Sequence, residues 1–176
     1  MISANEEIAN FILKIGHFSI KNAVDLGCGK GRISLKLAER GIKVLGVDLK
    51  DCSVKSKNFS FVQEDVRKFK FERNFDLIVC SVVLHFLKKS VSLEMIKKIQ
   101  QVTSNAGLNW LILMSDKDDF YKSNPGNFYP NLELVKKLYS GWEILVEKQD
   151  YTEIENHDNL GEHRHNLIFI VFRRKG

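Results

Sequence analysis

Apolar and polar residues recur along the chain in two alternating patterns, one with the spacing of a strand and one with that of a helix. Residues 5–15 repeat apolar side chains at helical spacing, and either Asn5 or Ser3 can cap the first turn. Short runs rich in β-branched and aromatic residues predict strands at residues 23–26, 44–47, 59–62, 75–80, 108–114, 142–147 and 166–172. Further helical patterns cover residues 33–40, 92–102 and 132–139. This alternation predicts an α/β three-layer sandwich with a mostly parallel sheet.

The connections between the predicted strands refine this architecture. Residues 49–58 and 66–74 are short for parallel crossovers, which normally need about a dozen residues or more, so we expect single turns or reduced helices there. The last two strands, within residues 142–151 and 166–173, are joined without a helical pattern. They should therefore pair antiparallel at one edge of the sheet.

The length and composition indicate one domain. A chain of 176 residues with 44% hydrophobic residues can build one core, and no linker or internal repeat divides it, so we expect residues 1–176 to form a single domain. The longest nearly apolar run, residues 77–87, is too short to cross a bilayer. Glu6 and Glu7 stand where a secretory signal would be basic. We therefore expect a soluble, cytoplasmic protein without a membrane partner.

The cysteines and charges argue against several classes of function. Cys28, Cys52 and Cys80 form no C-x-x-C pair, which argues against a disulfide framework and against a cysteine zinc site. The net charge is +5, but the basic residues come as dispersed pairs, which favours solvated surfaces over a nucleic-acid interface. The sequence predicts no metal site and leaves the oligomeric state open.

Three glycines at alternate positions, Gly27, Gly29 and Gly31, lie between the first predicted strand and the helix that follows it. The chain must turn sharply there, and a ligand can approach its backbone. A dinucleotide-binding turn instead spaces its glycines G-x-G-x-x-G and holds a pyrophosphate at the helix N-terminus. Here Asp25 precedes the first glycine, and its carboxylate would repel a pyrophosphate but attract the ammonium or sulfonium charge of S-adenosylmethionine. The pattern therefore favours this methyl donor.

Acidic residues also follow the second and third predicted strands. Asp48, with Leu49 beside it, lies about 20 residues after the glycine turn, where a carboxylate can accept hydrogen bonds from ribose hydroxyls. Asp65, with Val66 beside it, follows the next strand and can accept a bond from an adenine amino group. Each aspartate alone could be an ordinary turn former. Three at successive strand ends favour a shared cofactor site.

The whole chain resembles the class I S-adenosylmethionine-dependent methyltransferases, whose cofactor motifs match residues 25–31, Asp48 and Asp65. The resemblance implies a Rossmann-like sheet of seven strands with the last one antiparallel. It also implies that the glycine turn holds the methionine end of the donor and that backbone near Ser81 lines the same pocket. A narrower resemblance, in residues 75–87 and 138–143, is to the tellurite-resistance methyltransferases, which are associated with methylating small soft nucleophiles.

The tellurite-resistance group uses His and Arg near its C-terminal hairpin, and His163, Arg164 and His165 offer these residue types here, although the hairpin does not align cleanly with the group's pattern. In a strand, His163 and His165 point to one face and Arg164 to the other. These three are the candidate catalytic residues. His157 nearby suggests a metal cluster as an alternative, but no ligand pattern completes it.

Candidate acceptor-binding residues come from three other segments. His85 follows the fourth strand at the carboxyl edge of the sheet, where open α/β proteins bind ligands. Phe128 and Tyr129 lie in a loop of turn residues that could cover a site or merely connect two elements. Phe11 could join the same pocket, although its helical spacing equally suits the core.

The sequence therefore predicts methyl transfer from S-adenosylmethionine to a small molecule, such as a thiol or a tellurium or selenium oxyanion. This reaction is an in-line displacement whose main requirements are alignment and desolvation. A general base matters only if the acceptor arrives protonated, and cationic side chains matter only if it arrives as an anion. The alternatives are an RNA methyltransferase and a non-catalytic module that binds S-adenosylmethionine.

Overall fold

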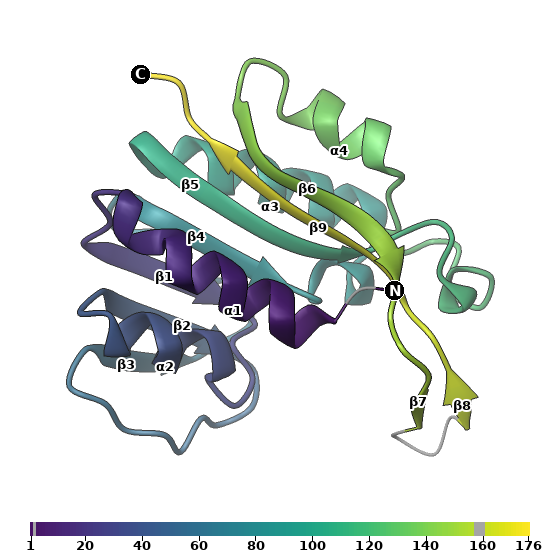
Figure 1. The fold of residues 1–176 in the computed structure, drawn as a ribbon, viewed down its shortest axis with the longest axis horizontal. Coiled ribbons are helices and arrows are strands. Elements are labelled where there is room, and N and C mark those ends of the chain that lie inside the picture. Colours follow the sequence, from purple (N-terminus) through teal and green to yellow (C-terminus); the bar gives the residue numbers. More distant parts are fainter. Residues whose placement is uncertain (2, 157–160) are drawn as a thin grey trace.

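A seven-stranded sheet forms the centre of the protein (Figure 1), in a computed structural model that describes residues 1, 3–156 and 161–176. Its strands are β1 (Asn22–Leu26), β2 (Lys43–Asp48), β3 (Phe59–Gln63), β4 (Phe75–Ser81), β5 (Thr103–Met114), β6 (Glu143–Tyr151) and β9 (Asn166–Arg173). They lie in the order β3-β2-β1-β4-β5-β9-β6. β9 is antiparallel to β5 and β6, and the described pairings from β3 to β5 are parallel. The predicted mostly parallel sheet with an antiparallel last strand is confirmed.

Helices cover both faces of the sheet, which gives three layers (Figure 1). One face packs against α1 (Ala4–Lys14) and α2 (Arg32–Glu39), and the other against α3 (Lys89–Gln101) and α4 (Leu132–Leu138). Alternate residues of β4 enter the two cores, with Leu77 on the first face and Ile78 on the second. Burial on both faces explains why this strand is a continuous apolar run. None of the described helices combines the length and apolarity needed to span a bilayer.

Two observed elements begin earlier than predicted, because their first residues lack an apolar pattern. β5 begins at Thr103, well before the predicted start at residue 108. Thr103 is buried and donates a hydrogen bond to the Asn109 side chain (2.8 Å), but residues 104–106 are half-buried or exposed. α3 likewise begins at Lys89 and not at residue 92, and its first two residues are exposed. Residues 66–74 contain a turn and no helix, as expected.

A second, two-stranded sheet was not predicted. β7 (Glu155–Asn156) and β8 (Glu162–His163) pair antiparallel between β6 and β9. Each strand has only two residues, which is too short for a periodic pattern to reveal. Figure 1 shows this small hairpin extending beyond the carboxyl edge of the main sheet.

The carboxyl ends of β1, β2, β4 and β5 meet at one edge of the sheet. β1 pairs with β2 on one side and with β4 on the other, so the connections after β1 and β4 diverge at this point. Open α/β sheets bind ligands in the crevice where the strand order reverses in this way. A ligand site is therefore expected among the residues that follow β1, β2 and β4.

Candidate functional site

The chain leaves β1 through a turn whose backbone conformation strongly favours glycine. Gly27, Gly29 and Gly31 have φ values of 71°, 54° and 76°, in the left-handed region. A Cβ atom on Gly27 would lie 2.1 Å from Cγ2 of Val83, so the loop after β4 packs directly on the turn. A Cβ on Gly29 would meet nothing within 4 Å, so the middle of the turn faces open space. The turn therefore packs on Val83 on one side and is accessible to a ligand on the other side, at Gly29.

Asp48 ties the end of β2 to this turn. Its Oδ2 accepts a hydrogen bond from the main-chain N–H of Gly29 (2.8 Å), and its Oδ1 accepts one from the N–H of Lys50 (2.9 Å). Each carboxylate oxygen keeps further accepting capacity. Beside it, Leu49 is 64% exposed, so an apolar surface adjoins the carboxylate. The sequence prediction that these two residues share one ligand site is compatible with this arrangement.

Asp25 lies beneath the turn and not on its open side. Its side chain is almost fully buried, and the hydroxyl of Ser34 in α2 donates a hydrogen bond to its Oδ2 (2.6 Å). Burial raises the pKa of Asp25 to about 6, and the bond from Ser34 counteracts part of this rise. The observed contacts give Asp25 the role of joining β1 to the start of α2. Direct contact with the ligand's positive charge stays a prediction.

Asp65 has a partner from its own loop. Nε of Arg67 donates to both carboxylate oxygens of Asp65 (2.9 and 2.8 Å), and the main-chain N–H of Arg67 donates to Oδ1 (2.9 Å). These hydrogen bonds from Arg67 lower the pKa of Asp65. An adenine amino group bound there would share the carboxylate with Arg67. The neighbouring Val66 is buried in the core on the α3 side.

The chain leaves β4 with an unusual backbone conformation. Ser81 is the last residue of β4, and Val82 after it has a φ of 54°, which is rare for a β-branched residue. The N–H of Val82 donates to the carbonyl oxygen of Ile112 (2.8 Å), which holds this backbone in place. Strained backbone of this kind is concentrated at functional sites. Ser81, which the sequence prediction named, directly precedes Val82, and its place in the donor pocket stays a prediction.

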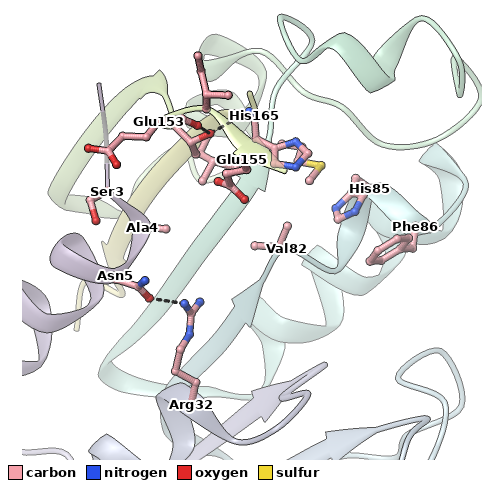
Figure 2. A pocket seen from close by; sticks show the side chains of 14 residues that line it. Ser3, Ala4, Asn5, Arg32, Val82, His85, Phe86, Glu153, Glu155 and His165 are labelled. Atoms are coloured by element: carbon pink, nitrogen blue, oxygen red, sulfur yellow. Dashed lines mark hydrogen bonds between the residues drawn. The ribbon is translucent and has the colours of Figure 1, made fainter. Parts of the chain in front are cut away.

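A cavity of about 520 Å³ opens beside this edge of the sheet (Figure 2). Its walls come from the starts of α1 and α2, the loop after β4, the end of β5 and the segments around the β7–β8 hairpin. Arg32 follows the glycine turn directly and Val82 follows β4, so the cavity adjoins the turn. Two of the predicted residues, His85 and His165, line it.

His85 lies in the wall of the cavity in η2 (Leu84–Phe86). It is 6% exposed, and its ring contacts those of Phe86 (3.9 Å between centroids) and Tyr129 (5.9 Å). Burial lowers the pKa of His85 to about 4, so the ring is neutral at pH 7. Its Nδ1 is buried and has no hydrogen-bond partner among the described residues. The cavity wall thus contains a neutral polar ring whose Nδ1 is buried and unsatisfied among the described residues.

The C-terminal histidines share one side of the chain, and the arginine between them does not. The rings of His163 and His165 are 5.0 Å apart, whereas Arg164 is exposed and lies over the Tyr151 ring (5.5 Å). Only His165 of the three lines the cavity. Its Nδ1 lies 3.1 Å from Oδ2 of the buried Asp118. The structure therefore separates the three candidate catalytic residues into different surroundings.

The aromatic candidates lie largely in the cores. Phe11 is 4% exposed and packs edge-on against Trp110 (4.6 Å), and Phe128 belongs to the core on the other face. Tyr129 contacts His85 but does not itself line the cavity. Of the two interpretations that the sequence left open for Phe11, a pocket residue and a core residue, the structure shows the core residue.

Several residues of the cavity were missed by the sequence prediction. They are Ser3, Ala4, Asn5, Arg32, Val82, Phe86, Met114, Thr152, Glu153, Ile154, Glu155 and Leu167. Figure 2 shows Arg32 hydrogen-bonded to Asn5, across the cavity from Glu153 and His165. Arg32 could have been found, because it follows the glycine motif at the start of a helix. The residues near the β7–β8 hairpin carry no comparable signal.

The described residues contain no group of three or more His, Cys, Asp or Glu side chains placed to hold a metal ion. His157, the remaining histidine considered for such a cluster, lies outside the described residues.

Comparison of the sequence with known proteins identifies the family of this chain. The model of the family described as “Tellurite resistance protein TehB” matches residues 11–172. A relative from Haemophilus influenzae, named “Probable S-adenosyl-L-methionine-dependent methyltransferase TehB”, is 29% identical over 147 residues, covering 78% of this chain and 51% of the relative. The chain therefore spans about half the length of the curated TehB relatives that it matches.

Solved structures share the fold. The crystal structure of TehB from Haemophilus influenzae has a TM-score of 0.78 and 23% identity, covering 97% of this chain and 62% of that one. The N-methyltransferase NodS from Bradyrhizobium japonicum, solved with S-adenosyl-L-homocysteine, has a TM-score of 0.75 and 16% identity, covering 98% and 87%. Because the family model matches most of its length, the chain belongs to the TehB tellurite-resistance family of S-adenosylmethionine-dependent methyltransferases, and the resemblance noted in its sequence is confirmed.

Proposed function

We propose that this chain transfers the methyl group of S-adenosylmethionine to a small-molecule acceptor that is a soft nucleophile. The observation that carries the proposal is the bond from Gly29 N–H to Asp48, which joins the open side of the glycine turn to the end of β2 beside the cavity. This arrangement offers a donor site and an acceptor space next to each other.

The residues around the turn fit the donor. The open space above Gly29 admits a ligand against the backbone, and Asp48 presents carboxylate oxygens for two ribose hydroxyls. The exposed Leu49 gives an apolar surface for a flat base. In these roles Gly27, Gly29 and Gly31 shape the turn. The backbone of Ser81 and Val82, at the carboxyl end of β4, lines the part of the site that takes the methionine portion of the donor.

An acidic group at the turn favours the donor over a dinucleotide. Asp25 lies below the turn, where its negative charge opposes a diphosphate, whereas Asp48 beside the turn would suit the ribose of either ligand. Arg32, at the start of α2 and in the cavity wall, is placed to attract a carboxylate such as that of the methionine tail. This pairing of a cation and anions suits a zwitterionic amino-acid group.

The donor, when bound, supplies an electrophilic methyl group and a neutral leaving group. The chain itself then has to align the acceptor and exclude water. The cavity wall combines apolar side chains, including Val82 and Met114, with the neutral His85 and with charged residues such as Arg32 and Glu153. The apolar part of this wall can exclude water around a small nucleophile. We assign the acceptor role to this cavity.

The test is formation of S-adenosylhomocysteine by the purified chain with a panel of acceptors. The panel contains alkyl and aryl thiols, selenite, tellurite and RNA, and each reaction is compared with one that lacks the acceptor. The proposal expects turnover with at least one small soft nucleophile and none above background with RNA. Donor binding without turnover across the panel would instead indicate a non-catalytic module. Turnover with RNA alone would replace the small-molecule assignment.

A further inference from the structure

A buried carboxylate contacts His165, which among the described C-terminal histidines is the one that lines the cavity. Asp118 lies just before η3 (Asp119–Tyr121), and its side chain has no exposed area. Its Oδ2 lies 3.1 Å from Nδ1 of His165 and accepts a bond from the main-chain N–H of Asn166 (3.0 Å). Its Oδ1 accepts from the N–H of Phe120 (3.0 Å). The carboxylate is therefore surrounded by donors and acts as an acceptor.

This contact selects the tautomer of His165. Because Asp118 accepts, Nδ1 carries the hydrogen, and in the neutral ring Nε2 then carries the lone pair. The main-chain N–H of His165 also donates to Oγ1 of Thr152 (3.0 Å), which fixes the backbone that carries the ring. His165 is 8% exposed, and Figure 2 shows its side chain at the cavity. The imidazole is thus held in one orientation and one tautomer.

Among the described residues, other titratable and charged groups contact this ring or line the same cavity. They include Asp118 from the loop after β5, His85 from η2, His163 from β8, Glu153 and Glu155 from the segment after β6, and Arg32 from α2. His85 stays neutral at pH 7, because burial holds its pKa at about 4. Asp118 contacts the His165 ring through its Oδ2.

The charged residues of the cavity wall indicate whether an anionic or a neutral acceptor fits there. Arg164, the cation among the three candidate catalytic residues, is exposed over Tyr151 and does not line the cavity. Arg32 does line it, hydrogen-bonded to Asn5, but the wall also carries Glu153. An oxyanion would meet this carboxylate, whereas a neutral acceptor that must lose a proton would meet an oriented imidazole.

We propose that His165, positioned by Asp118, takes the proton from a neutral thiol acceptor, an inference that rests on the proposed function. The thiol proton passes to Nε2, and the S–H electron pair stays on the acceptor sulfur. The acceptor sulfur forms the new S–CH3 bond while the bond between the methyl group and the donor's sulfonium sulfur breaks. The electron pair of the broken bond stays on the donor sulfur, which leaves as a neutral thioether. The imidazolium then releases its proton to solvent. Asp118 acts through His165 and is a positioning residue.

Two thiols of different acidity separate this role from a structural one. An alkyl thiol such as 2-mercaptoethanol is mostly protonated at pH 7, whereas a nitro-substituted thiophenol is already ionised and needs no base. Asp118→Asn should lower kcat for the alkyl thiol by about 100-fold or more and change kcat for the thiophenol by less than about threefold. The matched control is Asp119→Asn, an exposed neighbour, which should leave both reactions unchanged.

A readout without turnover tests the tautomer itself. In the donor-free protein, nitrogen NMR of ¹⁵N-labelled histidine should show His165 with hydrogen on Nδ1, and Asp118→Asn should shift the population toward hydrogen on Nε2. His165→Gln identifies the resonance and repeats the thiol comparison if Asp118→Asn does not fold. An unchanged tautomer in Asp118→Asn would remove Asp118 from the role.

The remaining outcomes separate the two proposals. Equal losses on both thiols, in Asp118→Asn or His165→Gln, would overturn proton removal. A wild-type chain that methylates selenite or tellurite but no thiol would overturn this inference and leave the proposed function standing. A wild-type chain without turnover on any acceptor would overturn both, even if the tautomer were as expected.

Discussion

Gly29 donates its main-chain hydrogen bond to the carboxylate of Asp48 at 2.8 Å, and this bond joins two sequence motifs that lie on different strands. The glycine turn follows β1 and the aspartate ends β2, so neither motif alone defines the site. The bond fixes the position of the carboxylate relative to the open side of the turn. A ligand that binds one motif is therefore within reach of the other.

Replacing Asp48 with Ala should weaken donor binding by about 1–3 kcal/mol, because charge-assisted hydrogen bonds to the ribose are lost and Gly29 loses its acceptor. Titration calorimetry with S-adenosylhomocysteine measures the change. Asp51→Ala, at an exposed aspartate nearby, is the matched control and should bind as the wild type does. An Asp48→Ala protein with wild-type affinity would remove Asp48 from the site.

Gly27→Ala should destabilise the fold far more than Gly41→Ala. Both glycines have positive φ, 71° and 82°, but a Cβ on Gly27 would lie 2.1 Å from Val83, whereas one on Gly41 would meet nothing within 4 Å. We expect a loss of about 2–5 kcal/mol for Gly27→Ala and about 1–2 kcal/mol for Gly41→Ala in urea unfolding. Adding Val83→Ala to Gly27→Ala should restore part of the loss. Equal losses in the two single variants would show that packing on Val83 is unimportant.

Asp25→Asn should gain stability relative to the wild type as the pH rises. Burial raises the pKa of Asp25 from 3.8 to about 6 in the folded state, so the protonated form is favoured there. The stability that this group contributes is full below pH 4 and is lost as the pH rises through about 6. Asn does not ionise and keeps an oxygen for the Ser34 hydroxyl. The difference in unfolding free energy should therefore move toward the variant by about 2–3 kcal/mol between pH 4 and pH 7. A difference that stays constant across this range would contradict the assignment.

Much of the fold was predictable because the central strands are buried on both faces. The apolar runs of β1, β2 and β4 and the helical spacing of α1 and α2 follow directly from burial, and the sheet confirms them. The early start of β5 was not predictable, because residues 104–106 are half-buried or exposed and interrupt the apolar pattern after the buried Thr103. A polar stretch of this kind looks like a loop in the sequence.

The candidate site also contains some features that the sequence predicts and others that only the fold reveals. The glycine turn and Asp48 are local motifs, since each is set by the conformation or the strand end at which it occurs. The pairing of Asp118 with His165 spans 47 positions in the sequence and depends on how the loop after β5 packs against the start of β9. Phe11 shows the converse, because its spacing fits both a core and a pocket and only its contact with Trp110 distinguishes them.

The most direct test of the central claim is a crystal structure of the chain with S-adenosylhomocysteine. We predict ribose hydroxyls within hydrogen-bond distance of the Asp48 carboxylate, the amino-acid tail over the Gly27–Gly31 turn and the thioether sulfur facing the cavity that His165 lines. Ligand density elsewhere on the molecule, with the turn and Asp48 untouched, would contradict it.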